Sequence, residues 1–197
     1  MLNVLIAGVG GQGSVLAAKI LAQAATEKGW QVRTAETIGM AQRGGNVLSH
    51  VRMGNVGESV QAPLVPKGQA NCIIALEPGE GLRAVDYLAP DGLLVTAQTG
   101  IVSVTADLTG VVYEPAQVIE SLSHTVPHFV SVDDESFCAA AGSRKVLNVG
   151  MLAAAVRASN ELGCGLGDAL SLEDLKAALA VCVKPQFLEM NLKALEE

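Results

Sequence analysis

The feature that most constrains the fold is a glycine-rich segment, Gly8-Val9-Gly10-Gly11-Gln12-Gly13. It follows an apolar run at residues 2–7, whose Leu, Val and Ile content is typical of a buried strand. It precedes residues 14–28, where apolar side chains recur at helical spacing until Gly29. Residues 31–37 are predicted to form the next strand. This order predicts a β-α-β unit, with two parallel strands and a right-handed crossover.

The rest of the chain continues the alternation and then becomes helical. We expect strands at residues 46–53, 72–76, 93–97, 101–105 and 129–132, and helices at residues 79–88, 115–122, 143–162, 172–183 and 185–195. Ser171 and Asp174 have the spacing of a capping box at the start of one of these helices. The pattern predicts one domain over residues 1–197. It is an α/β fold, a three-layer α/β/α sandwich with a mostly parallel (mixed) sheet and a helical C-terminal part.

Composition argues against several functional classes. The chain has 13 basic and 20 acidic residues, a net charge of −7 and 3% aromatic residues, so we expect no nucleic-acid partner. No apolar run reaches the ~18 residues that suggest a membrane span, and the start of the chain lacks the basic segment of an export signal. We therefore expect no membrane partner and a cytoplasmic location. No C-x-x-C pair occurs among the four cysteines, so we expect reduced thiols and no metal or iron–sulfur site (Cys72, Cys138, Cys164 and Cys182).

The glycine-rich segment has two interpretations. Glycines permit a tight turn, and the N-terminus of the following helix offers N–H groups and partial positive charge to a phosphate. Alternatively, the glycines only allow the strand and the helix to pack closely. Glu36, near the end of the second predicted strand, stands where an acidic residue would bind a ribose hydroxyl of NAD. Residues 39–45 are unlike a crossover helix, and the chain has little length for a second substrate domain, so NAD binding is the alternative hypothesis.

A second glycine-rich segment contains Arg43-Gly44-Gly45. An arginine beside paired glycines can present its guanidinium to a phosphate or carboxylate while the backbone passes close by. Taken alone, this arginine is better explained as a solvent-facing residue of a flexible loop.

The two segments together resemble a known family. GVGGQG, then ETIGMAQRGGNVLSHVRMG and ALEPGEGLRAVDYL, are similar to the γ-type subunit or domain of the 2-oxoacid:ferredoxin oxidoreductases. The GMAQRGG segment is most similar to the small β subunit of the indolepyruvate:ferredoxin oxidoreductases. SRKVLNVGMLAAA and KPQFLEMNLKAL extend the resemblance to nearly the whole chain, in the expected order. One departure is Ile38, where the family often has His before the Gly-Met-Ala-Gln run.

The resemblance implies an oxidoreductase that oxidatively decarboxylates a 2-oxoacid to an acyl-CoA and passes electrons to ferredoxin. It implies that thiamine diphosphate and the iron–sulfur clusters reside on a large α subunit, and that this chain is a partner rather than a complete enzyme. It also places the two glycine segments near CoA, or at the cofactor cleft between the subunits. The candidate binding residues are Gly8, Gly10, Gly11, Gln12, Gly13, Met40, Gln42, Arg43, Gly44 and Gly45. A stand-alone Rossmann-type NAD- or CoA-binding protein is the alternative, and no catalytic residue is assigned.

Four other polar residues have simpler structural interpretations. His50 lies on a predicted strand and is expected to be a hydrogen-bonded structural histidine. Glu77 and Glu80 are expected at the N-cap or first turn of a helix, where carboxylates are favourable. Asn148 is unfavourable within a helix and is expected to belong to an interface.

Overall fold

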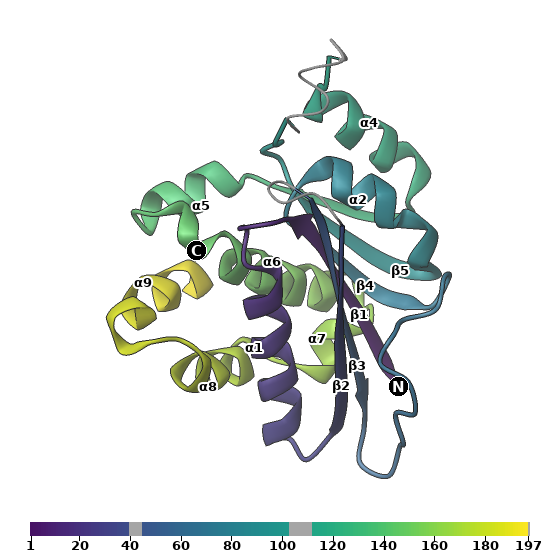
Figure 1. Ribbon diagram of the computed structural model, residues 1–197, viewed down its shortest axis with the longest axis vertical. Helices are drawn as coiled ribbons and strands as arrows, with labels where there is room; N and C mark the ends of the chain where they lie inside the picture. Colours follow the sequence, from purple (N-terminus) through teal and green to yellow (C-terminus); the bar gives the residue numbers. More distant parts are fainter. Residues whose placement is uncertain (40–44, 103–111, 197) are drawn as a thin grey trace.

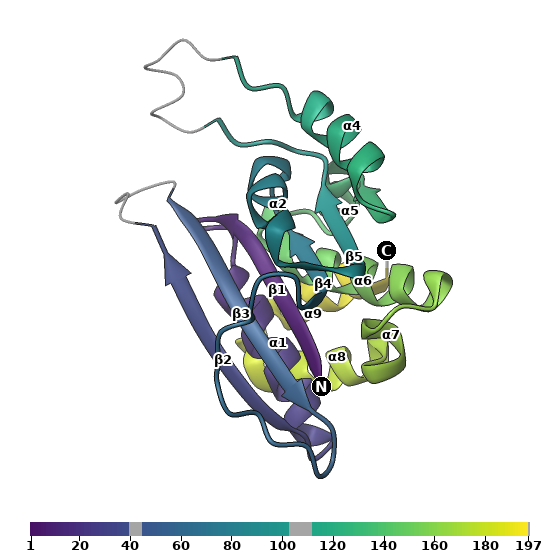
Figure 2. The same cartoon turned by 90° about the vertical axis from the view of Figure 1, so that its right-hand side faces the viewer.

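The computed structural model describes residues 1–39, 45–102 and 112–196, and within them six strands form one mixed sheet. The sheet order is β2-β3-β1-β4-β5-β6. Neighbouring strands β1, β4, β5 and β6 are parallel, whereas β3 is antiparallel to both β1 and β2. Figure 2 shows the arrowheads of β1, β2, β4 and β5 directed toward one end of the sheet. The strands are β1 (Leu2–Val9), β2 (Gln31–Ile38), β3 (Asn46–Gly54), β4 (Ala70–Ala75), β5 (Leu88–Ala97) and β6 (His128–Val132).

Helices cover both faces of this sheet. Figure 1 shows α1, α6, α8 and α9 on one side, and α2 and α4 on the other. This is the expected three-layer α/β/α arrangement with a helical C-terminal part. The helices in the described residues are α1 (Ser14–Glu27), α2 (Pro78–Ala84), α4 (Pro115–Thr125), α5 (Asp134–Ala140), α6 (Leu147–Leu162), α7 (Leu166–Ala169), α8 (Leu172–Cys182) and α9 (Pro185–Glu196), with 3-10 turns at Val85–Tyr87 and Arg144–Val146.

Strand β1 shows how the sheet supports two cores. Val4 and Ile6 belong to the core beneath α1 and α6, and Leu5 and Ala7 belong to the core beneath α2 and α4. All four side chains are fully buried. Successive residues of a strand point to opposite faces, so a strand covered on both sides must be continuously apolar. The apolar run at the start of the sequence is therefore a consequence of its central position.

The predicted parallel pairing of the first two strands is wrong. Strand β3 lies between β1 and β2, and pairs with both along its length. The two outer strands still run in the same direction, so the helix α1 does cross over between them. Only seven residues, 39–45, connect β2 to β3, and so short a connection suits an antiparallel pair. Strand β3 therefore runs back along β2 and lies between β2 and β1.

The helical tail begins and ends close to the predicted residues. The predicted 143–162 helix starts as the 3-10 turn Arg144–Val146 and continues as α6. The Ser171–Asp174 capping box is confirmed, with both reciprocal hydrogen bonds formed. The short helices α5 and α7 are not predicted from the sequence. Of the strand expected at 101–105, residues 101 and 102 are not in a strand, and the remainder lies outside the described residues.

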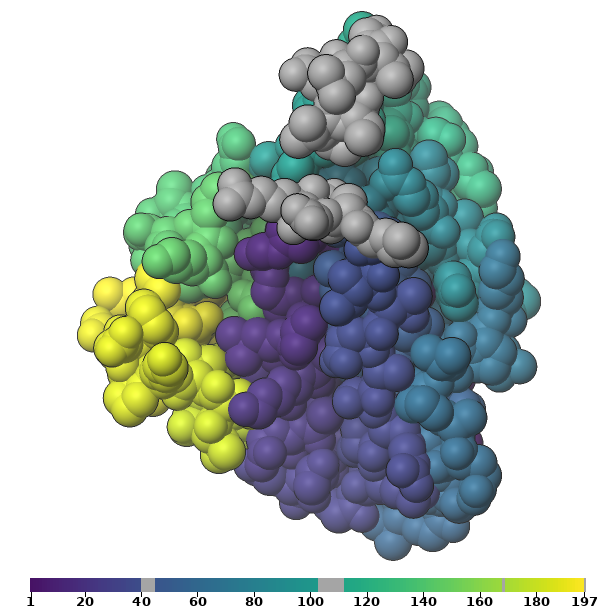
Figure 3. Space-filling view, viewed as in Figure 1, coloured from purple at the N-terminus to yellow at the C-terminus, as the bar shows by residue number. Residues whose placement is uncertain are grey.

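Strand β2 forms one edge of the sheet and is mostly exposed. Figure 3 shows this strand and α1, in indigo and purple, over much of the near face of the molecule. In the part of the chain that the structure describes, no helix combines the length and the apolar character needed to span a bilayer.

Candidate functional site

The candidate site lies at the end of the sheet where the parallel strands have their carboxyl ends. β1 ends at Val9, β4 at Ala75 and β5 at Ala97, and the antiparallel strand β3 begins at the same end with Asn46. In open α/β sheets, ligands bind outside the carboxyl ends of the strands. We call this part of the molecule the carboxyl edge.

The two glycine-rich segments of the sequence meet at the carboxyl edge. The backbone N–H of Gly10 donates to the carbonyl oxygen of Gly45 at 2.9 Å. The N–H of Gly39 donates to the carbonyl of Asn46 at 2.8 Å, which joins the end of β2 to the start of β3. The sequence therefore located two segments that the fold brings together. Four candidate residues of the second segment lie outside the described residues (Met40, Gln42, Arg43 and Gly44).

Gln12 holds the glycine loop to the neighbouring strand end. Its side-chain Oε1 accepts from the N–H of Val9, and its Nε2 donates to the carbonyl of Leu76, both at 2.7 Å. A Cβ at Gly8 would lie 3.0 Å from Gln12 Oε1 and 3.3 Å from the Leu76 side chain. The absence of a side chain at Gly8 thus leaves room for the Gln12 bridge. Both ends of this amide are engaged with the chain's own backbone.

Gly13 is needed for close packing between the loop and α6. It has φ +86°, and a Cβ there would lie 2.6 Å from Nδ2 of Asn148. That nitrogen donates to the Gly13 carbonyl at 3.0 Å. Asn148 is almost fully buried, so its expected place at an interface with another chain is wrong. The loop carbonyl is the physical reason for a polar residue inside the first turns of α6.

Gly11 is the open position of the loop. It has φ +99°, and no atom lies within 4 Å of the place where its Cβ would be. The N–H groups of Gly11 and Gly13 have no hydrogen-bond partner among the described residues, and no side chain caps α1. Free N–H groups at the start of a 14-residue helix can bind an anion. The loop therefore combines close packing at Gly8 and Gly13 with free N–H donors on Gly11 and Gly13.

Glu77 organises the next strand end, after β4. It is buried and is the N-cap of α2, accepting from the N–H of Glu80 at 2.9 Å, as the sequence predicted. Its other oxygen accepts from the hydroxyl of Tyr113 and from the N–H of Ile101 at 3.3 Å. The Tyr113 hydroxyl also accepts from the N–H of Gly79 at 3.0 Å. Sequence reasoning missed Tyr113, because no local pattern links it to a strand end thirty-six residues earlier.

Glu80 occupies the first turn of α2, as expected. Its carboxylate pairs with Arg83, and its Oε2 has no hydrogen-bond partner among the described residues. Burial raises the pKa of this carboxyl group, and the charge of Arg83 opposes that effect.

Asp134 follows β6 and connects its end to the end of β5. Sequence reasoning missed this residue as well. It is fully buried, and its Oδ1 accepts from the N–H groups of Gln98 and Thr99 at 2.8 and 2.9 Å. Its Oδ2 accepts from Nη2 of Arg144 at 2.8 Å. Gln12, Glu77 and Asp134 therefore each connect the ends of neighbouring strands through hydrogen bonds between the side chain and the backbone. The available signal for Asp134 was the pair of acidic residues, Asp133 and Asp134, that follows a predicted strand.

Two other sequence-selected residues lie away from the loop. Glu36 is on β2, which β3 separates from β1, so it is two strand spacings, roughly 10 Å, from the strand that carries the glycine loop. The NAD hypothesis required the acidic residue on the strand beside β1. His50 is buried on β3, where Nδ1 accepts from the N–H of Val65 at 3.2 Å. Its expected structural role is confirmed, and burial lowers the pKa of its imidazole.

Comparison with known proteins identifies relatives over nearly the whole chain. The model of the pyruvate ferredoxin/flavodoxin oxidoreductase family matches residues 3–197. The indolepyruvate oxidoreductase subunit IorB of Archaeoglobus fulgidus is 38% identical over 99% of this chain and 92% of its own length. IorB of Thermococcus kodakarensis is 33% identical over 98% of this chain and 92% of its own length.

Solved structures share the fold at lower identity. The gamma subunit of the keto/oxoacid ferredoxin oxidoreductase from Geobacter sulfurreducens has a TM-score of 0.69 and 22% identity, covering 100% of this chain and 95% of its own. The 2-oxoglutarate:ferredoxin oxidoreductase from Magnetococcus marinus, solved with coenzyme A bound, has a TM-score of 0.68 and 20% identity. The match covers 99% of this chain and 30% of that longer one.

Proposed function

The chain belongs to the pyruvate ferredoxin/flavodoxin oxidoreductase family, and from this we propose that it is the small subunit of an indolepyruvate-type 2-oxoacid:ferredoxin oxidoreductase. The similarity to IorB over 99% of the chain carries the proposal. We also propose that residues 1–197 form one γ-type domain. The six strands, which lie between residues 2 and 132, form a single sheet, and the helices that follow them pack on it.

The proposed complex oxidatively decarboxylates an aryl 2-oxoacid. Carbon dioxide leaves, the acyl group joins the sulfur of CoA, and two electrons pass to ferredoxin. Thiamine diphosphate, when bound, supplies the carbanion chemistry, and iron–sulfur clusters carry the electrons. Among the described residues of this chain, no group of three or more His, Cys, Asp or Glu side chains could hold a metal. From the resemblance to the family we assign thiamine diphosphate and the iron–sulfur clusters to the large α subunit, and assign substrate positioning and subunit contact to this chain.

The carboxyl edge is the proposed contact with CoA. The unpartnered N–H groups of Gly11 and Gly13, at the uncapped start of α1, favour a phosphate of CoA. Arg43 lies in the segment that leads to Gly45 and would add a guanidinium to the same anion. Gly8 and Gln12 shape the loop from inside and do not face the ligand in this proposal.

Exposed apolar side chains around the carboxyl edge support a protein partner there. Four of these side chains are 40–64% exposed: Val15 in the first turn of α1, Ile38 at the end of β2, and Ile101 and Val102 after β5. Clustered exposed apolar side chains mark protein contact surfaces. We propose that the large α subunit covers them. Ile38 would then provide apolar contact at the position where the family often has histidine.

Reconstitution tests the proposal. The chain is co-expressed with the large subunit from the same source, purified through a tag on this chain, and assayed for CoA-dependent reduction of a viologen dye with indole-3-pyruvate, phenylpyruvate and pyruvate. A stable complex with activity on aryl 2-oxoacids is expected. If no complex forms and the mixture reduces no dye with any 2-oxoacid, the proposal is wrong. Micromolar binding of NADH to the isolated chain, without binding of CoA, would favour the alternative of a stand-alone NAD-binding protein.

A further inference from the structure

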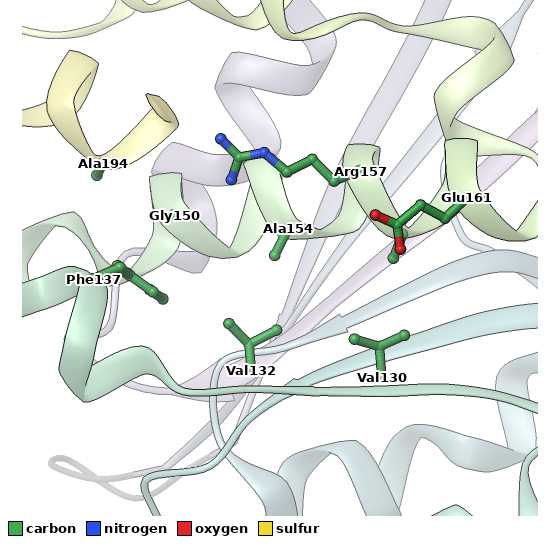
Figure 4. Close-up of a pocket in the computed structure, with 9 residues that line it drawn as sticks. Val130, Val132, Phe137, Gly150, Ala154, Arg157, Glu161 and Ala194 are labelled. Carbon is green, nitrogen blue, oxygen red and sulfur yellow. The ribbon is translucent and has the colours of Figure 1, made fainter. Parts of the chain in front are cut away.

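A cavity lies on the flank of the molecule, between α6 and the edge strand β6. Its volume is about 220 Å³. Figure 4 shows Val130 and Val132 on one side and Ala154 on the facing helix, with Phe137 at one end. The Gly10–Gly45 contact of the carboxyl edge is not part of its lining. We call this space the flank cavity, and what it binds does not depend on the proposed function.

The sequence creates this cavity through small residues on α6. A Cβ at Gly150 would lie 2.3 Å from the ring of Phe137, so glycine is required for that ring to pack on the helix. One turn later, Ala154 leaves the space above Val130 and Val132 unfilled. These valines are only half-buried because β6 is the last strand of the sheet. The part of the wall formed by Val130, Val132, Phe137 and Ala154 is therefore apolar.

Two opposite charges line the same cavity without neutralising each other. Arg157 and Glu161 are four residues apart on α6, which places them on one side of the helix. In Figure 4, the Glu161 carboxylate lies on the Val130 side of α6, and Arg157 extends along α6 toward α9. Among the described residues, neither side chain takes part in an ion pair. Arg157 donates through Nη2 to the carbonyl of Leu195 at 2.6 Å, which leaves its other N–H groups available.

We propose that the flank cavity binds a free α-amino acid with an apolar side chain. The ammonium group would pair with Glu161, the carboxylate with Arg157, and the side chain would lie against Val130, Val132 and Ala154. The two charges favour this choice, because a simple carboxylate pairs with Arg157 but is repelled by Glu161, and a simple amine pairs with Glu161 but is repelled by Arg157. A zwitterion on one carbon meets both charges, and a cavity of about 220 Å³ accommodates a branched aliphatic side chain.

Calorimetric titration of the full chain with three matched compounds tests the charge selection. L-leucine carries both charges, 4-methylpentanoate lacks the ammonium group, and 3-methylbutylamine lacks the carboxylate. We expect L-leucine to bind and each single-charge compound to bind at least about tenfold more weakly, since each lost charged hydrogen bond costs that factor or more. Absence of L-leucine binding overturns the proposal. Equal affinity for all three compounds also overturns it, because the cavity would then accept any apolar group.

Two variants assign the binding to this cavity. Glu161→Gln should weaken L-leucine about tenfold and strengthen 4-methylpentanoate, since the repelling charge is removed. Ala154→Leu should abolish binding of all compounds by filling the cavity, while leaving the far-ultraviolet circular dichroism and the cooperativity of unfolding unchanged. Unchanged L-leucine affinity in either folded variant would place the binding elsewhere and refute the assignment.

Discussion

The backbone N–H of Gly10 lies 2.9 Å from the carbonyl oxygen of Gly45 and donates a hydrogen bond to it. This bond joins the turn after β1 to the residue before β3, so two glycine-rich segments far apart in the sequence form one rim. The rim is a consequence of β3 pairing directly with β1, because the antiparallel register brings Asn46 opposite Val9. A change in either segment therefore affects the shape of the same site.

Gly11→Val should abolish CoA-dependent activity at a modest cost in stability. A β-branched residue resists the φ of +99° at this position, and the strain costs about 1–2 kcal/mol. No atom is near enough to clash, so the rest of the domain should fold normally. The new side chain would occupy the approach to the free N–H groups. Urea denaturation and dye reduction by the reconstituted complex give the two quantities.

Gly29→Val is the matched control for this prediction. Gly29 has φ +77° with no atom within 4 Å of its Cβ position, but it follows the opposite end of α1. It should lose a similar amount of unfolding free energy and retain activity. Equal loss of activity in both variants would show that the loop has no ligand role and acts only through folding.

Asp134→Ala and Asp134→Asn should separate hydrogen bonding from charge. In the alanine variant the N–H of Thr99 loses its partner, whereas the N–H of Gln98 retains the carbonyl of Val132 at 3.1 Å. Arg144 also loses its partner but is half-exposed, so water can solvate it. We expect the free energy of unfolding to fall by about 2–3 kcal/mol for alanine and about 1 kcal/mol for asparagine, which keeps an acceptor. Identical losses in urea denaturation would contradict this separation.

His50 should make stability fall as the pH is lowered from neutrality. The bond from the N–H of Val65 requires Nδ1 without a proton, and burial lowers the pKa of the folded imidazole below its ordinary value of 6.5. The unfolded chain therefore binds the proton first, so stability declines as the pH falls below about 6.5 and is unaffected above it. Denaturation at about pH 7.5 and about pH 5.5 measures the decline.

His50→Gln provides the control for the pH dependence, because its amide oxygen can accept a hydrogen bond and does not titrate in this range. Its stability should be lower than that of the wild type near neutrality. It should also change less between the two pH values. A decline as large as that of the wild type would assign the dependence to other groups.

Local sequence patterns predicted most elements of this fold, while the pairing of strands depended on information they do not contain. Periodicity identified β1 and β3 as strands, because both bury apolar residues. It could not show that β3 inserts between β1 and β2, since any pairing of three such strands satisfies the same pattern. The glycine spacing likewise located the loop and could not identify Asn148, whose contact with Gly13 joins residues 135 positions apart.

The hydrogen-bonded strand ends show the same division. Glu77 was recognisable as an N-cap from the Pro78 that follows it, because that signal is local. Its bond to Tyr113 depends on how the chain returns to α4 and has no local signal. Residues whose partners lie within one turn were therefore predictable, and residues that join different strand ends required the structure.

Arg43→Ala should reduce acyl-CoA formation by the reconstituted complex while leaving the stability of this chain within about 0.5 kcal/mol, because we expect a guanidinium beside paired glycines to add little to the core. The proposed role is a charged contact with CoA, so KM for CoA should rise more than about tenfold, since a lost charged hydrogen bond costs that factor or more. Arg33→Ala is the control, because Arg33 lies on the exposed strand β2 and its side chain donates to the carbonyl of Val60. Its KM should stay at the wild-type value. The salt dependence of KM adds an independent readout, since losing a phosphate contact should flatten it. If Arg43→Ala lowers stability and kcat together and leaves KM for CoA unchanged, the arginine supports folding or subunit assembly instead of binding CoA.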